Sequence, residues 1–382
     1  MPRIERPSSP ERCAEVLREC ADGRRTVRVR GGGTKDQLGT RRDTDVVVET
    51  SDLGGIVDHV PEDLTVTVLG GMRFDVLRAA LAVHGQLLPL DPPHTTRGAT
   101  VGGIIAANSS GFGRYRYGGV RDLLLGVRAA LPDGTIARAG GRVVKNVAGY
   151  DLNKLFVGSL GTLGVIVEAT FKILPIPPVT RAAAATFAGS TAAFTAAAAL
   201  VRTSLRPTAL VVEHTERSWR LVVAAAGERA PVDRAMDELA RVAAANGATA
   251  EPLADPEDTL GPLREIVAAA SSGIVIRAVL PLSAQAAFAE AAIRGERRTR
   301  IVADAACAII HVHLPEGADA VAAETLIASA RVLGGSARVE RATIAGLEPF
   351  SGPEPAGAFL MRRLKDAFDP SGILEPGRSA IG

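Results

Sequence analysis

The chain of 382 residues has few cysteines, no excess of one charge and no long apolar run. Its three cysteines, Cys13, Cys20 and Cys307, have neither CxxC nor metal-site spacing, so they form no disulfide framework and no ligand set for an iron–sulfur cluster. The odd cysteine count is typical of a reducing compartment. The net charge of +2, without a dense basic cluster, argues against nucleic-acid binding.

Segments that would direct the chain into a membrane are also missing from the sequence. It begins MPRIER, without the apolar region of a secretory signal, and Thr, Ser and Arg interrupt or bound the alanine runs at 182–185 and 196–199. We therefore expect no direct membrane insertion. The expected location is the cytoplasm, with attachment to the inner membrane only through partners.

Glycine, by contrast, is abundant, with 40 residues. The segment TVRVR at 26–30 alternates like a half-buried strand and runs directly into GGGTK at 31–35. Because glycine lets main-chain N–H groups approach an anion without an intervening Cβ, this strand and turn predict a site for a diphosphate. The spacing matches neither GxGxxG nor GxxxxGK[ST], which argues against a Rossmann domain and a P-loop.

Further motifs follow in a fixed order along the chain. They are LPLDPPH at 88–94, ATVGG at 99–103, NSSG at 108–111, VRDLLLG at 120–126, KNVAGYDL at 145–152, GSLGTLGVI at 158–166 and FDPSGILEPGR at 368–378. This series resembles the FAD-linked oxidases of the vanillyl-alcohol oxidase/p-cresol methylhydroxylase (PCMH) type. Within them it is most similar to the FAD-binding E subunits of bacterial glycolate oxidases (glycolate dehydrogenases). The resemblance covers about residues 28–178 and the last segment.

The resemblance implies which residues bind the FAD cofactor. The glycine loop would cradle the pyrophosphate, residues 92–103 and 108–111 would run along the flavin, residues 161–166 would close over the adenine, and the tail would return to the FAD domain. The implied cofactor-binding residues are Arg30, Gly31, Gly32, Gly33, Thr34, Lys35, Pro92, Pro93, His94, Ala99, Thr100, Val101, Gly102, Gly103, Asn108, Ser109, Gly111, Tyr117, Gly161, Thr162, Gly164, Val165, Ile166 and Arg378.

The glycine loop also bears on how the flavin is held. Relatives with covalent FAD usually carry a histidine in or just after this loop, where this chain has Thr34 and Lys35. Noncovalent FAD is therefore expected. Lys35 is either a point charge near the diphosphate or a solvated loop lysine, and both alternatives stay open.

The hydrophobic patterns indicate an α+β protein with two cores, divided by the proline-rich connector ILPIPPV at 173–179. Before the connector they predict strands at 24–30, 45–49, 65–69, 124–131, 136–139 and 165–174 and a helix at 74–84. After it they predict strands at 182–187, 209–214, 219–225, 274–280 and 306–313 and helices at 192–202, 232–245, 284–294 and 319–333. The second set favours a ferredoxin-like antiparallel sheet with helices on one face.

The resemblance assigns these parts to domains. It implies a two-part PCMH-type FAD-binding domain at 1–178, an α+β cap or substrate domain at 179–355, and a C-terminal segment at 356–382 that returns to the FAD domain. In this family the cap covers the reactive side of the flavin.

The resemblance implies FAD-dependent oxidation of glycolate or a similar small 2-hydroxy acid to the 2-oxo acid. The flavin accepts a hydride, and the protein supplies a carboxylate anchor and a base for the hydroxyl proton. Arg277, within the apolar segment GIVIRAVLPLS, is the predicted anchor because a guanidinium matches a carboxylate bidentately. The alternative for Arg277 is a sheet-edge arginine that reaches solvent.

His94 in the PPH motif is the predicted catalytic base. His311 and His313 lie on one face of a predicted strand, where we expect surface roles, and two histidines do not complete a metal site. Lys145, Asn146 and Tyr150 would contact flavin or substrate, or only support the next strand. No metal site is expected.

The resemblance also implies partners, namely a second flavin subunit and an iron–sulfur subunit. This chain lacks the histidine-rich cluster of the related catalytic subunit, and Ser336 stands where close E-subunit relatives have a histidine. Two functions therefore stay open, an FAD-dependent oxidoreductase acting on CH–OH groups and an FAD-carrying electron-transfer or scaffold subunit whose partner does the substrate chemistry. A sugar or alcohol oxidase is less favoured, because the covalent-flavin histidine is missing.

Overall fold

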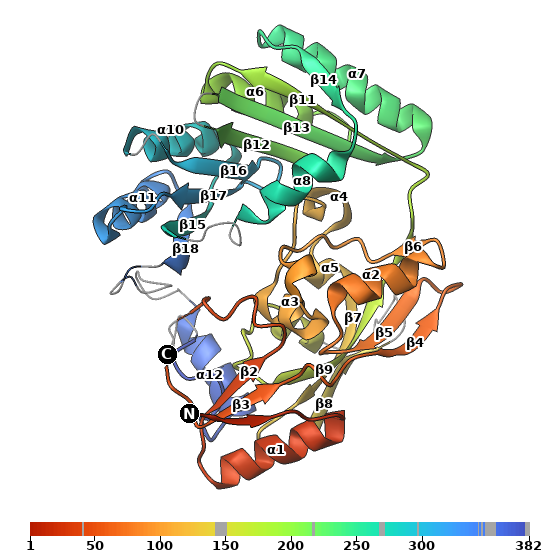
Figure 1. Cartoon of the computed structure of the whole chain (residues 1–382), viewed down its shortest axis with the longest axis vertical. Helices are drawn as coiled ribbons and strands as arrows, with labels where there is room; N and C mark the ends of the chain where they lie inside the picture. The colour runs from red at the N-terminus through yellow and green to blue at the C-terminus, as the bar shows by residue number, and fades with distance from the viewer. Residues whose placement is uncertain are drawn as a thin grey trace. The chain divides into compact units, whose positions relative to one another are not determined.

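The computed structural model describes residues 1–39, 42–141, 151–215, 218–266, 272–295, 298–342, 344, 347 and 357–378. The chain divides into two compact units (Figure 1). Unit 1 comprises Met1–Ser110, Gly118–Ile176 and Gly352–Gly382, and unit 2 comprises Gly111–Tyr117 and Pro177–Ser351. Each unit has its own sheets and its own core.

Unit 1 begins with a small parallel sheet in the order β1-β3-β2. Its strands are β1 (Arg3–Glu5), β2 (Val27–Arg30) and β3 (Val46–Glu49), and α1 (Pro10–Asp22) connects the first two. The Oγ of Ser9 caps α1 by accepting a hydrogen bond from the Arg12 N–H, and Pro10 occupies the first turn, where its missing N–H is tolerated. The predicted strand at 24–30 begins only at Val27, because Arg24 has a φ of 48° and turns the chain.

A five-stranded antiparallel sheet in the order β4-β5-β9-β7-β8 forms the larger part of unit 1. Its strands are β4 (Ile56–Val60), β5 (Thr65–Leu69), β7 (Leu124–Ala130), β8 (Ile136–Gly140) and β9 (Val165–Lys172), beside a short pair of β6 (Gln86–Leu87) with β10 (Leu174–Pro175). The helices are α2 (Phe74–Ala82), α3 (Val101–Ala107) and α5 (Val120–Leu123), with single turns η1 (Thr95–Arg97) and η2 (Leu152–Leu155). Ile166 packs with α2 and α3, while Val165 and Val167 pack with α1.

The C-terminal segment closes unit 1. After α12 (Ala358–Phe368), Ile373 and Leu374 are buried in the core around α1, and the backbone of β2 exchanges hydrogen bonds with Ile373 and Glu375. Lys365 Nζ donates to the carbonyls of Thr162 and Leu374 at 3.0 and 2.8 Å and pairs with the buried Asp369. Segments from both ends of the chain therefore share one core.

Unit 2 contains an eight-stranded antiparallel sheet in the order β14-β11-β13-β12-β16-β17-β15-β18. Its first half is β11 (Val179–Phe187), α6 (Ser190–Val201), β12 (Ala209–Thr215), β13 (Ser218–Gly227), α7 (Arg229–Ala245) and β14 (Ala250–Leu253). Its second half is β15 (Ile274–Val279), α10 (Gln285–Gly295), β16 (Arg300–Asp304), β17 (Ile309–Leu314), α11 (Ala320–Val332) and β18 (Ser336–Ala342), with the turn η3 (Leu282–Ala284). Both halves have the ferredoxin-like βαββαβ order, and β12 pairs with β16 to join them. The predicted single ferredoxin-like sheet is thus doubled.

The two faces of this sheet differ in chemistry. Apolar residues of α6, α7, α10 and α11 cover one face and form its main core (Figure 1). On the opposite face, α8 (Pro256–Arg264) and Phe112 cover the first half. Phe112 comes from the segment with α4 (Arg114–Tyr117), where Arg206 donates to the Tyr115 hydroxyl at 3.1 Å. The opposite face of the second half carries polar side chains, and we call this surface the open face. Its polar residues include Arg277, His311, Arg338 and Glu340.

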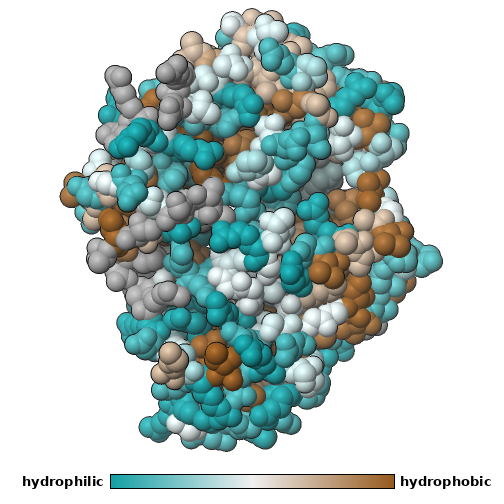
Figure 2. Space-filling view, viewed as in Figure 1, coloured by the Kyte–Doolittle hydropathy of each residue, from teal (hydrophilic) through white to brown (hydrophobic). Residues whose placement is uncertain are grey.

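Some apolar side chains of unit 1 stay exposed. Ile56, Val57, Val83 and Ile176 are between 39% and 83% exposed. Figure 2 shows brown, apolar atoms along the side of unit 1 where Figure 1 labels β4 and β6. None of these four residues lines the groove described below.

The buried cysteines give a prediction about thiol reactivity. Burial raises the pKa of Cys13 to about 12 and also raises that of Cys20, while Cys307 is half-buried. Since the thiolate is the reactive form, Cys13 and Cys20 should resist a disulfide reagent at pH 8 until the protein unfolds. Counting thiols with and without denaturant tests this, with Cys307→Ser as the control that removes the accessible thiol. Rapid modification of two thiols in the native Cys307→Ser variant would contradict the prediction.

Candidate functional site

A groove of about 790 Å³, part of it open to solvent, lies within unit 1. Most of its lining comes from three segments, the loop after β2, the segment that contains α3, and the loop before β9 with the start of β9, and Thr50 and Arg378 add to it. Its lining residues are Val29, Gly31, Gly32, Gly33, Thr34, Lys35, Asp36, Thr50, Pro93, Ala99, Thr100, Gly102, Gly103, Ile104, Ala106, Ala107, Ser109, Leu160, Gly161, Gly164, Val165, Ile166 and Arg378.

Main chain forms much of the groove wall because two glycines of the loop press directly against neighbouring atoms. A Cβ at Gly32 would lie 1.7 Å from the carbonyl oxygen of Gly98, and one at Gly31 would lie 2.2 Å from Thr100 Oγ1. Contacts that short are impossible, so any side chain here would push the loop away from residues 98–100. The glycine loop and the segment before α3 can therefore lie together only as bare backbone.

The helix α3 fixes the second wall. Thr100 caps it, with its Oγ1 accepting from the Gly103 N–H at 3.3 Å. The N–H groups of Val101 and Gly102 donate to the carbonyls of Met72 and Gly70, at 2.9 and 2.7 Å. These bonds satisfy the first amides of a helix that two glycines would otherwise destabilise.

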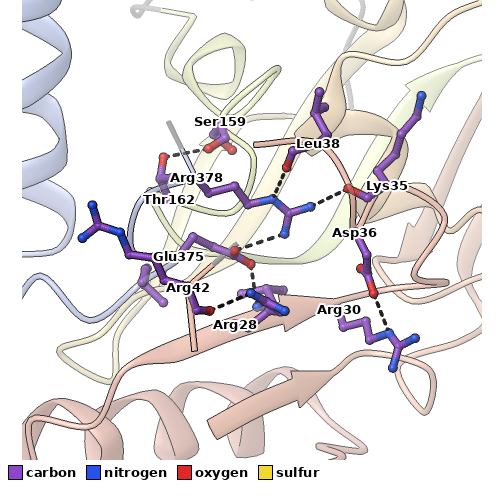
Figure 3. Close-up of polar contacts among 12 residues, drawn as sticks. Arg28, Arg30, Lys35, Asp36, Leu38, Arg42, Ser159, Thr162, Glu375 and Arg378 are labelled. Atoms are coloured by element: carbon purple, nitrogen blue, oxygen red, sulfur yellow. Dashed lines mark hydrogen bonds and ion pairs between the residues drawn. The ribbon is translucent and has the colours of Figure 1, made fainter. Parts of the chain in front are cut away.

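Arg378 ties the C-terminal tail to the glycine loop (Figure 3). Its guanidinium donates to the carbonyls of Lys35 and Leu38 at 2.8 and 3.2 Å and to Glu375 Oε2 at 3.0 Å. Glu375, 3% exposed, also accepts from the Val29 N–H at 2.7 Å through Oε1. Burial raises the pKa of Glu375, and the positive charge of Arg378 opposes that rise.

The charges of the loop are partly paired within the protein. Arg30 Nε lies 3.2 Å from Asp36 Oδ2 (Figure 3). Arg30 Nη1 lies 3.4 Å from Glu49 Oε1. The first ion pair offsets the negative charge of Asp36 beside the groove. Lys35 and Arg378 are the basic members of the lining set.

Most of the predicted cofactor-binding residues line the groove, but eight lie elsewhere. Outside it are Arg30, Pro92, His94, Val101, Asn108, Gly111, Tyr117 and Thr162. Arg30 turns toward Asp36, Val101 is buried in the core, and Asn108, with φ 48°, ends α3. Thr162 donates to the Ser159 carbonyl, and Gly111 and Tyr117 belong to unit 2.

The predicted base, His94, is 3% exposed and has a φ of 68°. Its carbonyl accepts from the N–H groups of Arg97 and Ala99, so its backbone shapes the turn before α3. Its ring is buried in unit 1 and is not part of the groove lining. The catalytic role of His94 stays a prediction, for a residue outside the groove lining.

The prediction missed Val29, Asp36, Thr50, Ile104, Ala106, Ala107 and Leu160 as lining residues. Helix α3 contains three of them, Ile104, Ala106 and Ala107. This helix was not predicted because its sequence VGGIIAA contains two glycines. Lys145, Asn146 and Tyr150 lie outside the described residues.

The open face of unit 2 brings together the predicted anchor and several other charged groups. Arg277 on β15 pairs in register with His311 on β17 and with Arg338 on β18. Glu340 approaches all three: its Oε1 lies 4.0 Å from Arg277 Nε and 3.3 Å from Arg338 Nη2, and its Oε2 lies 3.6 Å from His311 Nε2. Burial lowers the pKa of Arg277, and Glu340 opposes this.

In the described part of the chain, the histidine, cysteine, aspartate and glutamate side chains form no group of three or more that would hold a metal ion. Within the same residues, the helices are all too short or too polar to cross a bilayer.

Comparison with known proteins identifies the groove-bearing region. Residues 2–140 match the family model described as an FAD binding domain. The chain is 39% identical over 163 residues to the glycolate oxidase subunit GlcE of Escherichia coli K12, covering 43% of this chain and 46% of that relative. It is 31% identical over 286 residues to the glycolate oxidase subunit GlcD of Bacillus subtilis 168, covering 70% and 60%.

A third relative is the mitochondrial D-lactate dehydrogenase (cytochrome) 1 of Saccharomyces cerevisiae, 38% identical over 170 residues, or 44% of this chain and 28% of that relative. The chain spans less than two thirds of the length of each of these relatives. A solved alkyldihydroxyacetonephosphate synthase matches 97% of this chain and 75% of its own, with a TM-score of 0.73 and 16% identity. The predicted α+β fold class, the FAD-linked oxidase resemblance and the FAD cofactor are thereby confirmed.

The close approach at Gly32 predicts that Gly32→Ala weakens FAD binding. Because the new methyl group would collide with the Gly98 carbonyl, we expect about 10- to 100-fold weaker binding, which corresponds to ~1–3 kcal/mol of overpacking. Titration of the apoprotein with FAD, followed by flavin fluorescence, measures it. Gly54→Ala is the matched control, since its nearest atom would lie 3.8 Å away. Equal affinities of the two variants would contradict the prediction.

The buried pair of Glu375 and Arg378 predicts a pH-dependent loss of stability in Arg378→Ala. Without the guanidinium the pKa of Glu375 rises further, so the folded state favours the neutral acid while the unfolded chain ionises at about 4.3. Below pH 4 the variant should lose only the contacts of Arg378 with the Lys35 and Leu38 carbonyls, and it should lose about 3–5 kcal/mol more as the pH rises to 7. Denaturant unfolding at both pH values measures this.

The double variant Arg378→Ala/Glu375→Gln is the control for that experiment. Removing the ionisable group should abolish the extra pH dependence, because a neutral amide occupies the site at every pH. An equal loss of stability at pH 4 and pH 7 in Arg378→Ala would show that packing, and not the Glu375 charge, dominates.

Proposed function

We propose that this chain, which its FAD binding domain places among the FAD-linked oxidases of the PCMH type, oxidises glycolate or a similar small 2-hydroxy acid to the 2-oxo acid. The names of its relatives, glycolate oxidase subunits and D-lactate dehydrogenases, support this substrate class. The observation that carries the proposal in this chain is the half-buried Arg277 among the cations of the open face.

The groove fits FAD because glycines from the loop after β2, from α3 and from the loop before β9 line it, which lets a flat, phosphate-bearing ligand approach the main chain. Gly31 to Gly33 would hold the diphosphate, with Lys35 as a nearby positive charge, and Gly161 to Ile166 would contact the far end. When bound, FAD supplies the acceptor for a hydride. The chain's own task is to hold the cofactor, orient the acid and remove a proton.

Arg277 would orient the acid by its carboxylate. Burial disfavours an isolated guanidinium charge. An anion that binds on the open face would therefore be stabilised by Arg277. Arg338 stands opposite Arg277 across β15 and β18, and Arg114 also contributes positive potential at Arg277. Together they favour an anionic substrate over a sugar or a simple alcohol.

We further propose that the chain works as a subunit of a glycolate oxidase-type complex. A second flavin subunit and an iron–sulfur subunit would be its partners, in the cytoplasm or at the inner membrane through them. The word subunit in the names of two relatives supports this. The alternative is an FAD-carrying electron-transfer or scaffold subunit, with the substrate chemistry in a partner.

An anaerobic titration separates these two functions. The purified FAD-loaded chain is mixed with glycolate or D-lactate, and the flavin absorbance is followed. Bleaching by the chain alone supports the oxidase. Bleaching only after the partner subunits are added supports the electron-transfer or scaffold function. It would also exclude substrate oxidation by this chain.

The loop residues Thr34 and Lys35 predict a noncovalent flavin, because neither side chain is the histidine of the covalent relatives. Acid precipitation of the holoprotein should release all yellow colour into the supernatant. Colour that stays with the washed precipitate would contradict the prediction, and absorbance of both fractions measures it.

Arg277→Lys should slow flavin reduction by the hydroxy acid without loss of FAD. An ammonium cannot form the bidentate contact, so kcat/KM should fall about 10- to 100-fold, as expected for one hydrogen bond to a charged group. Arg181→Lys, an exposed arginine of β11 that pairs with Asp233, is the matched control. Unchanged kinetics in Arg277→Lys would exclude this residue from the site.

A further inference from the structure

We infer that His311 is the base that takes the hydroxyl proton of the substrate, and that Glu340 is its positioning residue. The inference deepens the proposed function and rests on it, because it takes Arg277 as the carboxylate anchor. It takes the place of the predicted base His94, which is buried in unit 1 and does not line the groove.

The sheet register places His311 beside the anchor. Arg277 and His311 are direct partners on the antiparallel strands β15 and β17. The Cβ atoms of such partners lie about 5 Å apart on one face of the sheet. Their side chains are 23% and 24% exposed, so both are half-buried and reach the surface of the open face.

The shape of a 2-hydroxy acid requires this proximity. Its hydroxyl is on the carbon next to the carboxylate, so a group that removes the hydroxyl proton must stand beside the group that binds the carboxylate. Proton transfer needs hydrogen-bond distance between base and hydroxyl. A neighbouring strand at the same register meets this condition, and His311 is the titratable side chain there.

Glu340 gives the imidazole an orientation. Its Oε2 lies 3.6 Å from His311 Nε2. A carboxylate at this nitrogen favours the tautomer with the proton on Nε2, which leaves the lone pair of Nδ1 to accept the substrate proton. Once both nitrogens carry protons, the positive ring faces the negative Glu340.

Other charged groups around His311 act against this protonation. Arg277 on β15 and Arg338 on β18 repel an imidazolium, and Arg114 adds positive charge at Arg277, whereas Asp304 on β16 has the opposite sign. Glu340 is the carboxylate within 4 Å of both arginines and the histidine. Removal of the Glu340 carboxylate should therefore hinder proton transfer to His311 more than it hinders binding of the substrate.

His313, on the same strand and face, is differently placed. Its Nε2 lies 3.0 Å from the Ser272 carbonyl, and it pairs in register with Val275 and Arg300. The ring is thus held by main chain and is offset from Arg277 by two residues. It provides a matched control for His311.

The reaction balances with these groups. The hydroxyl O–H bond breaks, and the proton goes to His311 Nδ1. The α-carbon C–H bond would break, and bound FAD would supply the acceptor for its hydride with two electrons, so the substrate would be oxidised and the carbon–oxygen double bond of the 2-oxo acid would form.

The test compares FAD-loaded His311→Gln and His313→Gln with the wild type in two measurements. The first is calorimetric binding of oxalate, which has a carboxylate for Arg277 but no hydroxyl proton. The second is anaerobic stopped-flow reduction of the flavin by glycolate and by D-lactate. We expect His311→Gln to bind oxalate like the wild type but to be reduced about 10²- to 10⁴-fold more slowly. His313→Gln should match the wild type in both.

Chemical rescue distinguishes a base from a structural residue. Imidazole added to His311→Ala should restore part of the reduction rate, because a free base can occupy the vacated space, whereas it should not affect His313→Ala. Glu340→Gln should bind oxalate at least as tightly as the wild type, because a competing carboxylate is removed, and should slow reduction less than His311→Gln does.

Each contrary result has a separate meaning. Wild-type reduction rates in His311→Gln overturn the inference alone. So does a variant that loses oxalate binding in parallel with its rate and does not respond to imidazole, because His311 would then be a binding or structural residue. A wild-type flavin that neither acid reduces overturns the proposed function, and the inference with it.

Discussion

The contact on which the groove depends is the bridge from Arg378 to the glycine loop. It joins residues at opposite ends of the chain, since the guanidinium holds the carbonyls of Lys35 and Leu38 while Glu375 holds the Val29 N–H. The loop itself is glycine-rich and has little intrinsic preference for one conformation. The tail therefore helps to fix the shape of the loop, and the groove includes a residue from each end of the chain.

A second constraint is the lack of side chains at the points of closest approach. Gly31 and Gly32 contact Thr100 and the Gly98 carbonyl so closely that no other residue fits. Thr100 in turn caps α3, so one residue positions both the loop and the helix. Packing and capping together make a wall of backbone, which suits a large ligand because few side-chain rotamers must be ordered when it binds.

The sequence predicted the elements whose local pattern agrees with their final environment. The strand at 65–69 has the same bounds in the structure because TVTVL is rich in β-branched residues, and the glycine loop was found because glycine itself is the signal. Prediction from the sequence failed where contacts between residues far apart in the chain determine the structure. Strands β16 and β18 form by pairing with distant strands, and the carbonyls of residues 70 and 72 stabilise α3. The left-handed backbone of His94 cannot be recognised from a sequence motif.

The doubled sheet of unit 2 shows why its candidate chemistry could not be read from spacing. Arg277, His311 and Glu340 are far apart in sequence and become neighbours only through the order β17-β15-β18. Glu340 already lies beside Arg277 and Arg338. A simple carboxylate must compete with Glu340 for these two arginines and therefore gains little binding energy. On the proposed assignment, a 2-hydroxy acid adds a hydroxyl contact to His311 that such a competitor lacks, and the internal carboxylate thereby favours the substrate over other small anions.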